Sequence, residues 1–314
     1  MLARLQRLLV LTMMLGAVAW AAAFWAAGRH GWASIGVLLM ASVGAIFLGV
    51  EFMLAYAVQR RAAPPHASVH ALLRAWFGEV SAASEIFLWR QPFRSRSVLD
   101  ETENGHAQAH GVVLVHGYVC NRGLWNHWMR RFRALQTPFI AVNLEPVFGS
   151  IDDYPHIIEA AVSRLESKTR RTVVLVGHSM GGLAIRAWLE RYRADSRVRR
   201  IITVATPHRG TWLARYAHTR NGKEMRIGCQ WLKALAEHET PDRLSLFTCY
   251  YGPCDNIVFP VACGTLEGAV NRMIETRAHM DMLSVPDVFA EVAQWIDVEH
   301  RPAAQRPDDT GQIA

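Results

Sequence analysis

The chain has 314 residues, enough for one large domain with added segments or for two modest domains. Hydrophobic residues make up 51% and charged residues 19%, which disfavours an ordinary soluble protein because soluble domains carry about a quarter charged residues. The net charge of +7 suits an acidic surface, but there is no zinc-ligand spacing, RNA-binding signature or long basic run, so the sequence predicts no nucleic-acid partner.

Two apolar runs near the N-terminus indicate a membrane segment. Residues 8–27 carry no charge, and a second uncharged run covers residues 33–50 and resumes after Glu51. Each run reaches the roughly 20 residues needed to cross a bilayer core. Because the linker between them is short, we expect a transmembrane helical hairpin over residues 1–62, with Glu51 close to the membrane interface.

A signal peptide is the alternative interpretation of the first run. Arg4 and Arg7 form a basic start, and the alanines at 21–23 could be a cleavage site, although a cleaved signal does not require the second run. If the hairpin is retained, Arg4 and Arg7 precede it, and Arg60 and Arg61 follow it. The positive-inside rule then places both ends, and the large domain, in the cytoplasm.

Residues 63–109 read as a linker. Two prolines, Pro64 and Pro65, end the hairpin. Residues 68–88 then have apolar side chains at helical spacing, which predicts an amphipathic helix that lies either on the membrane or on the core of the following domain. A polar loop over 101–109 follows, and the polar tail 299–314 is predicted to be disordered.

From residue 111 short apolar runs alternate with helical stretches. This alternation predicts an α/β fold over residues 110–298, with a parallel sheet covered by helices on both faces. Strands are expected at 112–115, 139–142, 172–176, 200–204 and 244–250, and helices at 123–135, 155–167 and 180–193.

A glycine-flanked serine follows the third of these strands. The run Gly177, His178, Ser179, Met180 and Gly181 lies between the strand and a helix, which is the setting of a nucleophile elbow. The glycines fit because the serine of such a turn is strained and has no room for bulky neighbours. We therefore predict Ser179 as a nucleophile.

The first strand ends in a second motif. His116 and Gly117 close it, and the loop continues with Tyr118. A tetrahedral intermediate needs two N–H donors for its oxyanion, and the expected donors are Tyr118 and Met180. We expect the ring of His116 to hold the loop in shape rather than to act as a base.

The acid and the base of a triad are expected after the nucleophile in the chain. Asp255 lies in the loop after the strand at 244–250, at an end that faces the active site in open α/β sheets. Asp152 and Asp153 precede the serine and break this order. His279 is the predicted base, since an orienting carboxylate would fix its tautomer. The other downstream histidines are His208, His218, His238 and His300.

Five segments together resemble a known family. VLVHGY, VGHSMGGLAIRAWL, VATPHRGT, GPCDNIVFP and AHMDML are similar to the bacterial lipase and esterase-like α/β hydrolases, including lipase-like proteins related to GPI-inositol deacylases. The resemblance covers residues 110–297 and implies that Ser179, Asp255 and His279 form the triad. It also implies hydrolysis of carboxylic esters, often acyl lipids, without a metal or organic cofactor, and a location in a bacterial inner membrane.

The chain departs from the family at three points. The segment before residue 110 is not part of the lipase pattern, the first two strands of the full fold are not evident, and Tyr118 is bulkier than a small oxyanion-loop residue. Residues 209–240 match an insertion that acts as a cap or lid over the acyl pocket in lipases.

Several functions remain open at this point. The leading hypothesis is hydrolysis of a lipid or other apolar ester; acyl transfer by the same triad, a non-catalytic membrane scaffold and a transport protein are the alternatives. The oligomeric state is not predicted. The five cysteines are Cys120, Cys229, Cys249, Cys254 and Cys263. Their odd number predicts free thiols, although one disulfide bridge among the last four is left open.

Overall fold

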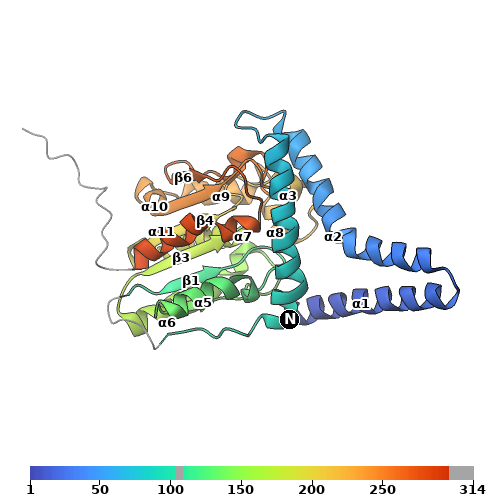
Figure 1. Ribbon diagram of the computed structural model, residues 1–314. Helices are drawn as coiled ribbons and strands as arrows, with labels where there is room; N and C mark the ends of the chain where they lie inside the picture. Colours follow the sequence, from blue (N-terminus) through green and yellow to red (C-terminus); the bar gives the residue numbers. More distant parts are fainter. Residues whose placement is uncertain (103–108, 297–314) are drawn as a thin grey trace, which may run out of the picture.

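The computed structural model describes residues 1–102 and 109–296. The predicted tail, His300 and most of the polar loop at 101–109 lie outside the described residues. The described chain forms an α/β domain from which two long helices project as a hairpin (Figure 1). The fold class expected from the sequence is therefore confirmed.

The domain is built on a parallel sheet of six strands in the order β2-β1-β3-β4-β5-β6. Its first strand, β1, pairs with both β2 and β3. No strand precedes β1 among the described residues, although an isolated antiparallel bridge joins Glu101 to Phe139 of β2. The strands are β1 (Val112–Val115), β2 (Phe139–Ala141), β3 (Val173–His178), β4 (Val198–Val204), β5 (Phe247–Tyr251) and β6 (Val270–Met273).

The helices fall into a projecting pair, a connecting pair and a set around the sheet (Figure 1). They are α1 (Leu2–Ala26), α2 (His30–Gln59), α3 (Val69–Ser84), α4 (Gln91–Arg94), α5 (Asn126–Ala134), α6 (Pro155–Thr169), α7 (Met180–Tyr192), α8 (Arg220–Glu224), α9 (Gln230–Glu237), α10 (Pro241–Ser245) and α11 (Pro286–Ile296). A π-helical segment, η1 (Glu85–Arg90), continues α3.

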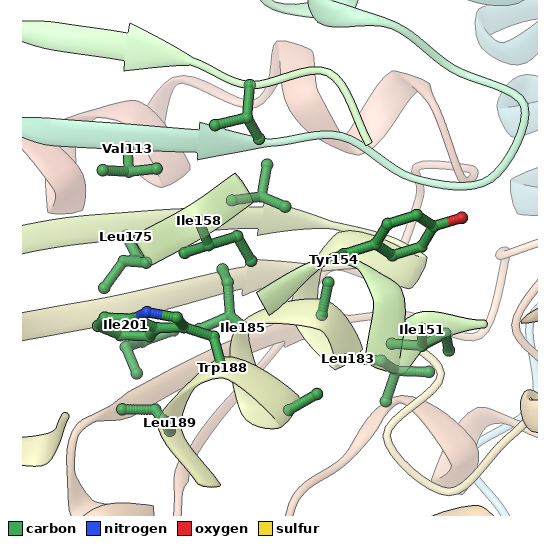
Figure 2. Packing of buried hydrophobic residues seen from close by; sticks show 14 of the residues in the cluster. Val113, Ile151, Tyr154, Ile158, Leu175, Leu183, Ile185, Trp188, Leu189 and Ile201 are labelled. Atoms are coloured by element: carbon green, nitrogen blue, oxygen red, sulfur yellow. The ribbon is translucent and has the colours of Figure 1, made fainter. Parts of the chain in front are cut away.

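Alternate residues of the strands pack on opposite faces of the sheet. Val113, Leu175 and Ile201 lie against α6 and α7, where Ile158 and Trp188 fill the layer (Figure 2). The other face is covered by α5 and α11. Because both faces of the central strands are buried, β1 (VVLV) is apolar throughout, as the sequence predicted, whereas the edge strand β6 (VNRM) is exposed.

The fifth predicted strand began too early. We expected it over residues 244–250, but Leu244 lies in α10 and the strand starts at Phe247. Thr240 caps this short helix by accepting a hydrogen bond from the Arg243 N–H, and Pro241 occupies its first turn. These two residues favour a helical turn where the apolar run alone predicted a strand.

The hairpin is closed by contacts between its two helices. Trp20 of α1 packs over Gly36 of α2, where an added Cβ would collide with the indole, and its Nε1–H donates to Trp32 O at 3.0 Å. In Figure 1 the N-terminal part of α2 runs beside α1, whereas its C-terminal part runs along the domain behind α3. The hairpin therefore joins the domain at both of its ends.

The helix predicted over 68–88 packs on the domain. Its Ala75 and Glu79 are buried against the loops that follow β5 and precede α11, and Ser68 caps its start. Its opposite face carries the exposed side chains of Val69, Leu73 and Phe77. One helix thus presents one face to the core and an apolar stripe to its surroundings.

Candidate active site

Ser179 occupies the sharp turn between β3 and α7. Its backbone has φ +55° and ψ −129°, a region that costs a residue with a Cβ about 1–3 kcal/mol. Its N–H donates to Val204 O at 2.9 Å, and its carbonyl accepts the hydroxyl of Thr206 at 2.9 Å. The end of the neighbouring strand β4 therefore holds the strained turn in place.

Two glycines leave room around this turn. A Cβ at Gly117 would lie 2.7 Å from the Cβ of Ser179, and a Cβ at Gly181 would collide with Val115 O. Real Cβ atoms do not approach so closely, so any larger residue would push the elbow away from the end of β1. Gly177 and His178, the other predicted motif residues, end β3 and are buried.

His279 and Asp255 form a buried pair beside the elbow. The Nδ1 of His279 lies 3.0 Å from Asp255 Oδ1 and 3.1 Å from Oδ2. Asp255 Oδ1 also accepts the N–H groups of Ile257 and Val258, both at 2.8 Å. The carboxylate is thus fixed by its own loop and aimed at the imidazole.

The pKa of His279 lies above its usual 6.5. Burial alone would lower it, but the charge of Asp255, the hydrogen bond to that carboxylate, and the charges of Glu79 and Glu51 outweigh burial. A histidine held this way stabilises its own cation, which a general base needs after it accepts a proton.

Ser179 and His279 line the same cavity, which has a volume of about 360 Å³. Within the described residues no hydrogen bond of ordinary length joins the Ser179 hydroxyl to the imidazole of His279. Catalytic contacts of this kind often tighten only when substrate binds.

His178 packs against His279 with ring centroids 4.8 Å apart. The Nε2–H of His178 donates to His279 O at 3.1 Å. Burial is the main reason that the pKa of His178 lies well below 6.5, so its ring is neutral and supports His279.

The two predicted oxyanion donors belong to a residue of the cavity lining and to the residue that follows Ser179. Tyr118 lines the cavity, and Met180 is the first residue of α7. In the part of the chain that the structure describes, neither main-chain N–H donates to a protein oxygen. Two unpaired N–H groups near a nucleophile can receive developing negative charge, and the start of α7 adds its positive dipole.

His116 is bonded on both ring nitrogens to main-chain groups. Its Nε2 accepts the Leu144 N–H at 3.0 Å, and its Nδ1–H donates to Gly117 O at 2.9 Å. Full burial lowers its pKa to about 4, so the ring stays neutral. These contacts tie the oxyanion loop to the segment after β2.

The other sequence candidates lie in contacts of their own. Asp152 Oδ1 accepts the Trp231 indole N–H, and Asp153 Oδ2 accepts the N–H of Ser150. His208 is buried against Thr203 with its Nε2 2.9 Å from the hydroxyl. Among the described residues, only Asp255 and His279 come together as a carboxylate–imidazole pair next to Ser179.

Residues 209–240 form the short helices α8 and α9 and the turn before them. This insertion contacts the oxyanion loop, since Thr219 Oγ1 lies 3.0 Å from the Tyr118 hydroxyl. In the described part of the chain, however, the lining of the cavity at Ser179 includes no residue of 209–240. Its role as a lid remains a prediction.

All five cysteines are free, so the one bridge that the sequence left open is absent. Cys120 lines the cavity, but burial raises the pKa of its thiol to about 12. A thiol with such a pKa is a poor nucleophile at neutral pH. The cysteine therefore does not compete with Ser179.

Two acids that the sequence analysis did not assign to the site lie beside the base. The Glu79 carboxylate of α3 accepts the N–H groups of Met280, at 2.9 Å, and Asp281, at 3.1 Å. Glu51 of α2 is buried in the protein, and its Oε2 accepts the Asn256 amide N–H at 2.7 Å. The sequence does carry a signal for both acids, because each lies within an apolar helical stretch, where an acid usually has a buried polar partner.

Replacing Glu79 with glutamine is expected to shift the acidic limb of the kcat/KM profile to lower pH. The pKa of Glu79 is raised to about 7, mainly by burial. When Glu79 is ionised, its negative charge favours the protonated form of His279. Removing that charge lowers the pKa of His279, and the neutral base then persists to lower pH. Glutamine keeps an oxygen for the two N–H groups. The measurement is kcat/KM for a soluble ester between pH 5 and 9.

Glu85→Gln is the matched control, because Glu85 continues the same helix but is exposed and pairs with Arg90. Its profile is expected to match the wild type. An unmoved limb in Glu79→Gln, with the same folding and thermal stability, would contradict the electrostatic role of Glu79.

Comparison with known proteins agrees with this geometry. The sequence profile described as the alpha/beta hydrolase family matches residues 112–304. The mature lipase BlEst2 of Bacillus licheniformis has a similar structure, with a TM-score of 0.55 and 19% identity over 63% of this chain and 96% of that one. Lipase B of Aspergillus fumigatus has a TM-score of 0.54 and 16% identity over 64% of this chain and 56% of that one.

No curated protein matches the sequence significantly. The likeness to the two lipases concerns the fold, since their identities to this chain are low. The family profile covers more than half of the chain and includes every strand of the sheet, the elbow and the loops with Asp255 and His279. The chain belongs to the alpha/beta hydrolase family.

Proposed function

We propose that the protein is a serine hydrolase that cleaves carboxylic esters of apolar acyl groups. The observation that carries the proposal is the buried pair of His279 and Asp255, whose imidazole lines the same cavity as Ser179. The walls of this cavity away from the pair are mainly apolar, which suits an acyl chain. The lipase structures with the same fold support an ester as the substrate class.

The proposed reaction runs through an acyl-enzyme. The Ser179 hydroxyl oxygen attacks the ester carbonyl while His279 Nε2 takes the hydroxyl proton. The carbonyl oxygen becomes an oxyanion that accepts hydrogen bonds from the N–H groups of Tyr118 and Met180. The ester C–O bond then breaks, and His279 returns the proton to the leaving alcohol. Water attacks the acyl-serine in the same way and releases the acid.

The proposal is tested by labelling the detergent-extracted full chain with a fluorescent fluorophosphonate. We expect one covalent adduct, on the peptide that contains Ser179, and no adduct after heat denaturation, because only the activated serine reacts. Mass spectrometry of the labelled peptide identifies the site. A folded protein that takes up no label would overturn the hydrolase function and favour a non-catalytic scaffold.

We also propose that α1 and α2 span a membrane with both ends on the cytoplasmic side. Both helices are long and apolar enough, and almost none of their apolar windows is buried in the protein, unlike a core helix. Arg4, Arg7, Arg60 and Arg61 lie at the domain end of the hairpin.

Trypsin is therefore expected to cut the domain in inverted bacterial membrane vesicles and to spare it in intact spheroplasts. An antibody against the C-terminus reads out the cleavage. Cleavage in spheroplasts alone would reverse the orientation, and release of the chain from membranes by carbonate at high pH would contradict the span itself.

A further inference from the structure

The cavity at Ser179 has one wall made by the hairpin. Gly44, Phe47 and Leu48 of α2 line it. Ala83, Phe87 and Leu88, at the end of α3 and in η1, line it as well. In an alpha/beta hydrolase the sheet and its loops supply the nucleophile, but here much of the space beside the nucleophile is enclosed by helices that precede the domain.

The chemistry of the cavity changes from one end to the other. Between α2 and η1 its walls are aliphatic and aromatic side chains, whereas Ser179 and His279 mark the catalytic end. The two acids that also line it, Glu51 and Glu79, have oxygens that accept hydrogen bonds from Asn256 and from Met280. An ester with a long apolar chain matches this order of polar and apolar surface.

The apolar end of the cavity opens onto exposed apolar surface. Phe47 and Leu88 line the cavity although 63% and 48% of their side chains are exposed. Leu73 and Phe77 of α3 and Trp89 of η1 are exposed as well. A soluble protein rarely exposes a large apolar patch unless something apolar covers it.

The position of the hairpin indicates what covers the patch. Its ends are fixed on the domain: Gln6 is hydrogen-bonded to Gln91 and Asn121, and Phe52 is buried against the loops of the triad. The free part of α1, residues 8–26, spans about 29 Å at 1.5 Å per residue, and residues 30–47 of α2 span about 27 Å. Both lengths match a hydrocarbon core of about 30 Å.

This match places the boundary of the hydrocarbon core near Phe47, at the open end of the cavity. The apolar face of α3 and η1 then lies along the membrane surface, across the base of the hairpin, as their arrangement in Figure 1 allows. An acyl chain could pass from the bilayer to the cavity without crossing water. A path through water would instead expose each CH₂ group of the chain to water, which is unfavourable.

We propose that the substrate is a lipid of the surrounding membrane, and that its acyl chain enters sideways between α2 and η1 and lies against Gly44, Phe47 and Leu88 while its ester reaches Ser179. The proposal rests on the ester-hydrolase function above and adds the substrate's source and the surface that selects it. The hairpin is accordingly a wall of the acyl site as well as an anchor.

Gly44→Trp tests the proposal, because an added Cβ at Gly44 meets no atom within 4 Å and a large side chain there can fill the cavity. The full chain is reconstituted in phosphatidylcholine vesicles that carry a palmitoyl ester of 4-methylumbelliferone, and the soluble butyryl ester is assayed in parallel. We expect kcat/KM for the palmitoyl ester to fall at least about tenfold, while the butyryl ester changes by less than about threefold.

Gly16→Trp is the matched control. Gly16 lies in α1, away from the cavity lining, and its Cβ position is equally open, so both substrates are expected to react as in the wild type. Leu88→Trp, at a cavity-lining residue of η1, is expected to reproduce the loss on the palmitoyl ester. It also guards against a folding defect peculiar to position 44.

The outcomes separate this proposal from the ester-hydrolase function. Equal losses on both esters, or no loss on either, in Gly44→Trp and Leu88→Trp would overturn the acyl route while the wild type still hydrolyses esters. If the wild type neither reacts with the fluorophosphonate nor hydrolyses the butyryl ester, the hydrolase function itself fails. Unchanged labelling rates in the tryptophan variants show that the triad has stayed intact.

Discussion

Ser179→Ala is expected to lower kcat for a soluble ester by on the order of 10⁶-fold, the scale reached when a serine nucleophile is removed from a triad. Alanine keeps the Cβ, so the strained backbone at φ +55° and its bonds to Val204 and Thr206 remain. The thermal midpoint should therefore stay close to that of the wild type. The measurement pairs ester kinetics with a melting curve of the same preparation.

Ser167→Ala is the control, because Ser167 is an exposed residue of α6 and its hydroxyl bonds only to Arg164 O. Its activity should equal that of the wild type. A Ser179→Ala protein that keeps more than a few per cent of wild-type activity, with the same preference among esters, would show that another group carries out the attack.

The sequence predicted the parts of the site that follow one another along the sheet. Each lies at the end of a strand, and parallel strands bring their carboxyl ends to one edge. Ser179 follows β3 directly, and Asp255 follows β5 by a short loop. The expected order of nucleophile, acid and base, together with the apolar runs of the strands, favoured Asp255 and His279 among several alternatives, and these two side chains are hydrogen-bonded to each other in the structure.

Glu79 and Glu51 were not assigned to the site because their contacts depend on tertiary placement. Glu79 bonds to Met280, 201 positions later, and Glu51 bonds to Asn256, 205 positions later. No local pattern encodes such a separation. The apolar runs predicted helices, and even a hairpin, but could not tell that the end of α2 and α3 pack on the loops with Asp255 and His279.

The lid was predicted at 209–240 by comparison with lipases. The insertion was recognised by its position between strands, as in lipases, and it does lie against the oxyanion loop through Thr219. The sequence before residue 110 had no family pattern to compare with, so its first two helices were assigned to a membrane hairpin and the helix at 68–88 to either the membrane or the domain core. The structure places α2 and η1 at the cavity, which moves the question of substrate access to the N-terminal region.

Asp255→Asn is expected to lower kcat for a soluble ester by about 10⁴-fold, the effect of a wrong histidine tautomer in a triad of this kind. An asparagine oxygen can take the place of Oδ1 and still accept the N–H groups of Ile257 and Val258. Its NH₂ group then faces His279 Nδ1, so that nitrogen must be an acceptor. The proton moves to Nε2, which can no longer take a proton from Ser179.

The residual activity of this variant should also have its acidic limb at lower pH than the wild type. Asp255 provides the largest attraction that raises the pKa of His279, and asparagine removes it. Asp152→Asn is the informative control, since Asp152 is the other candidate acid by sequence but is bonded to Trp231. If Asp152→Asn lost as much activity as Asp255→Asn, with both proteins folded, the assignment of the acid would be wrong. If only Asp255→Asn lost activity and had its acidic limb shifted to lower pH, the acid acts through the tautomer and charge of His279.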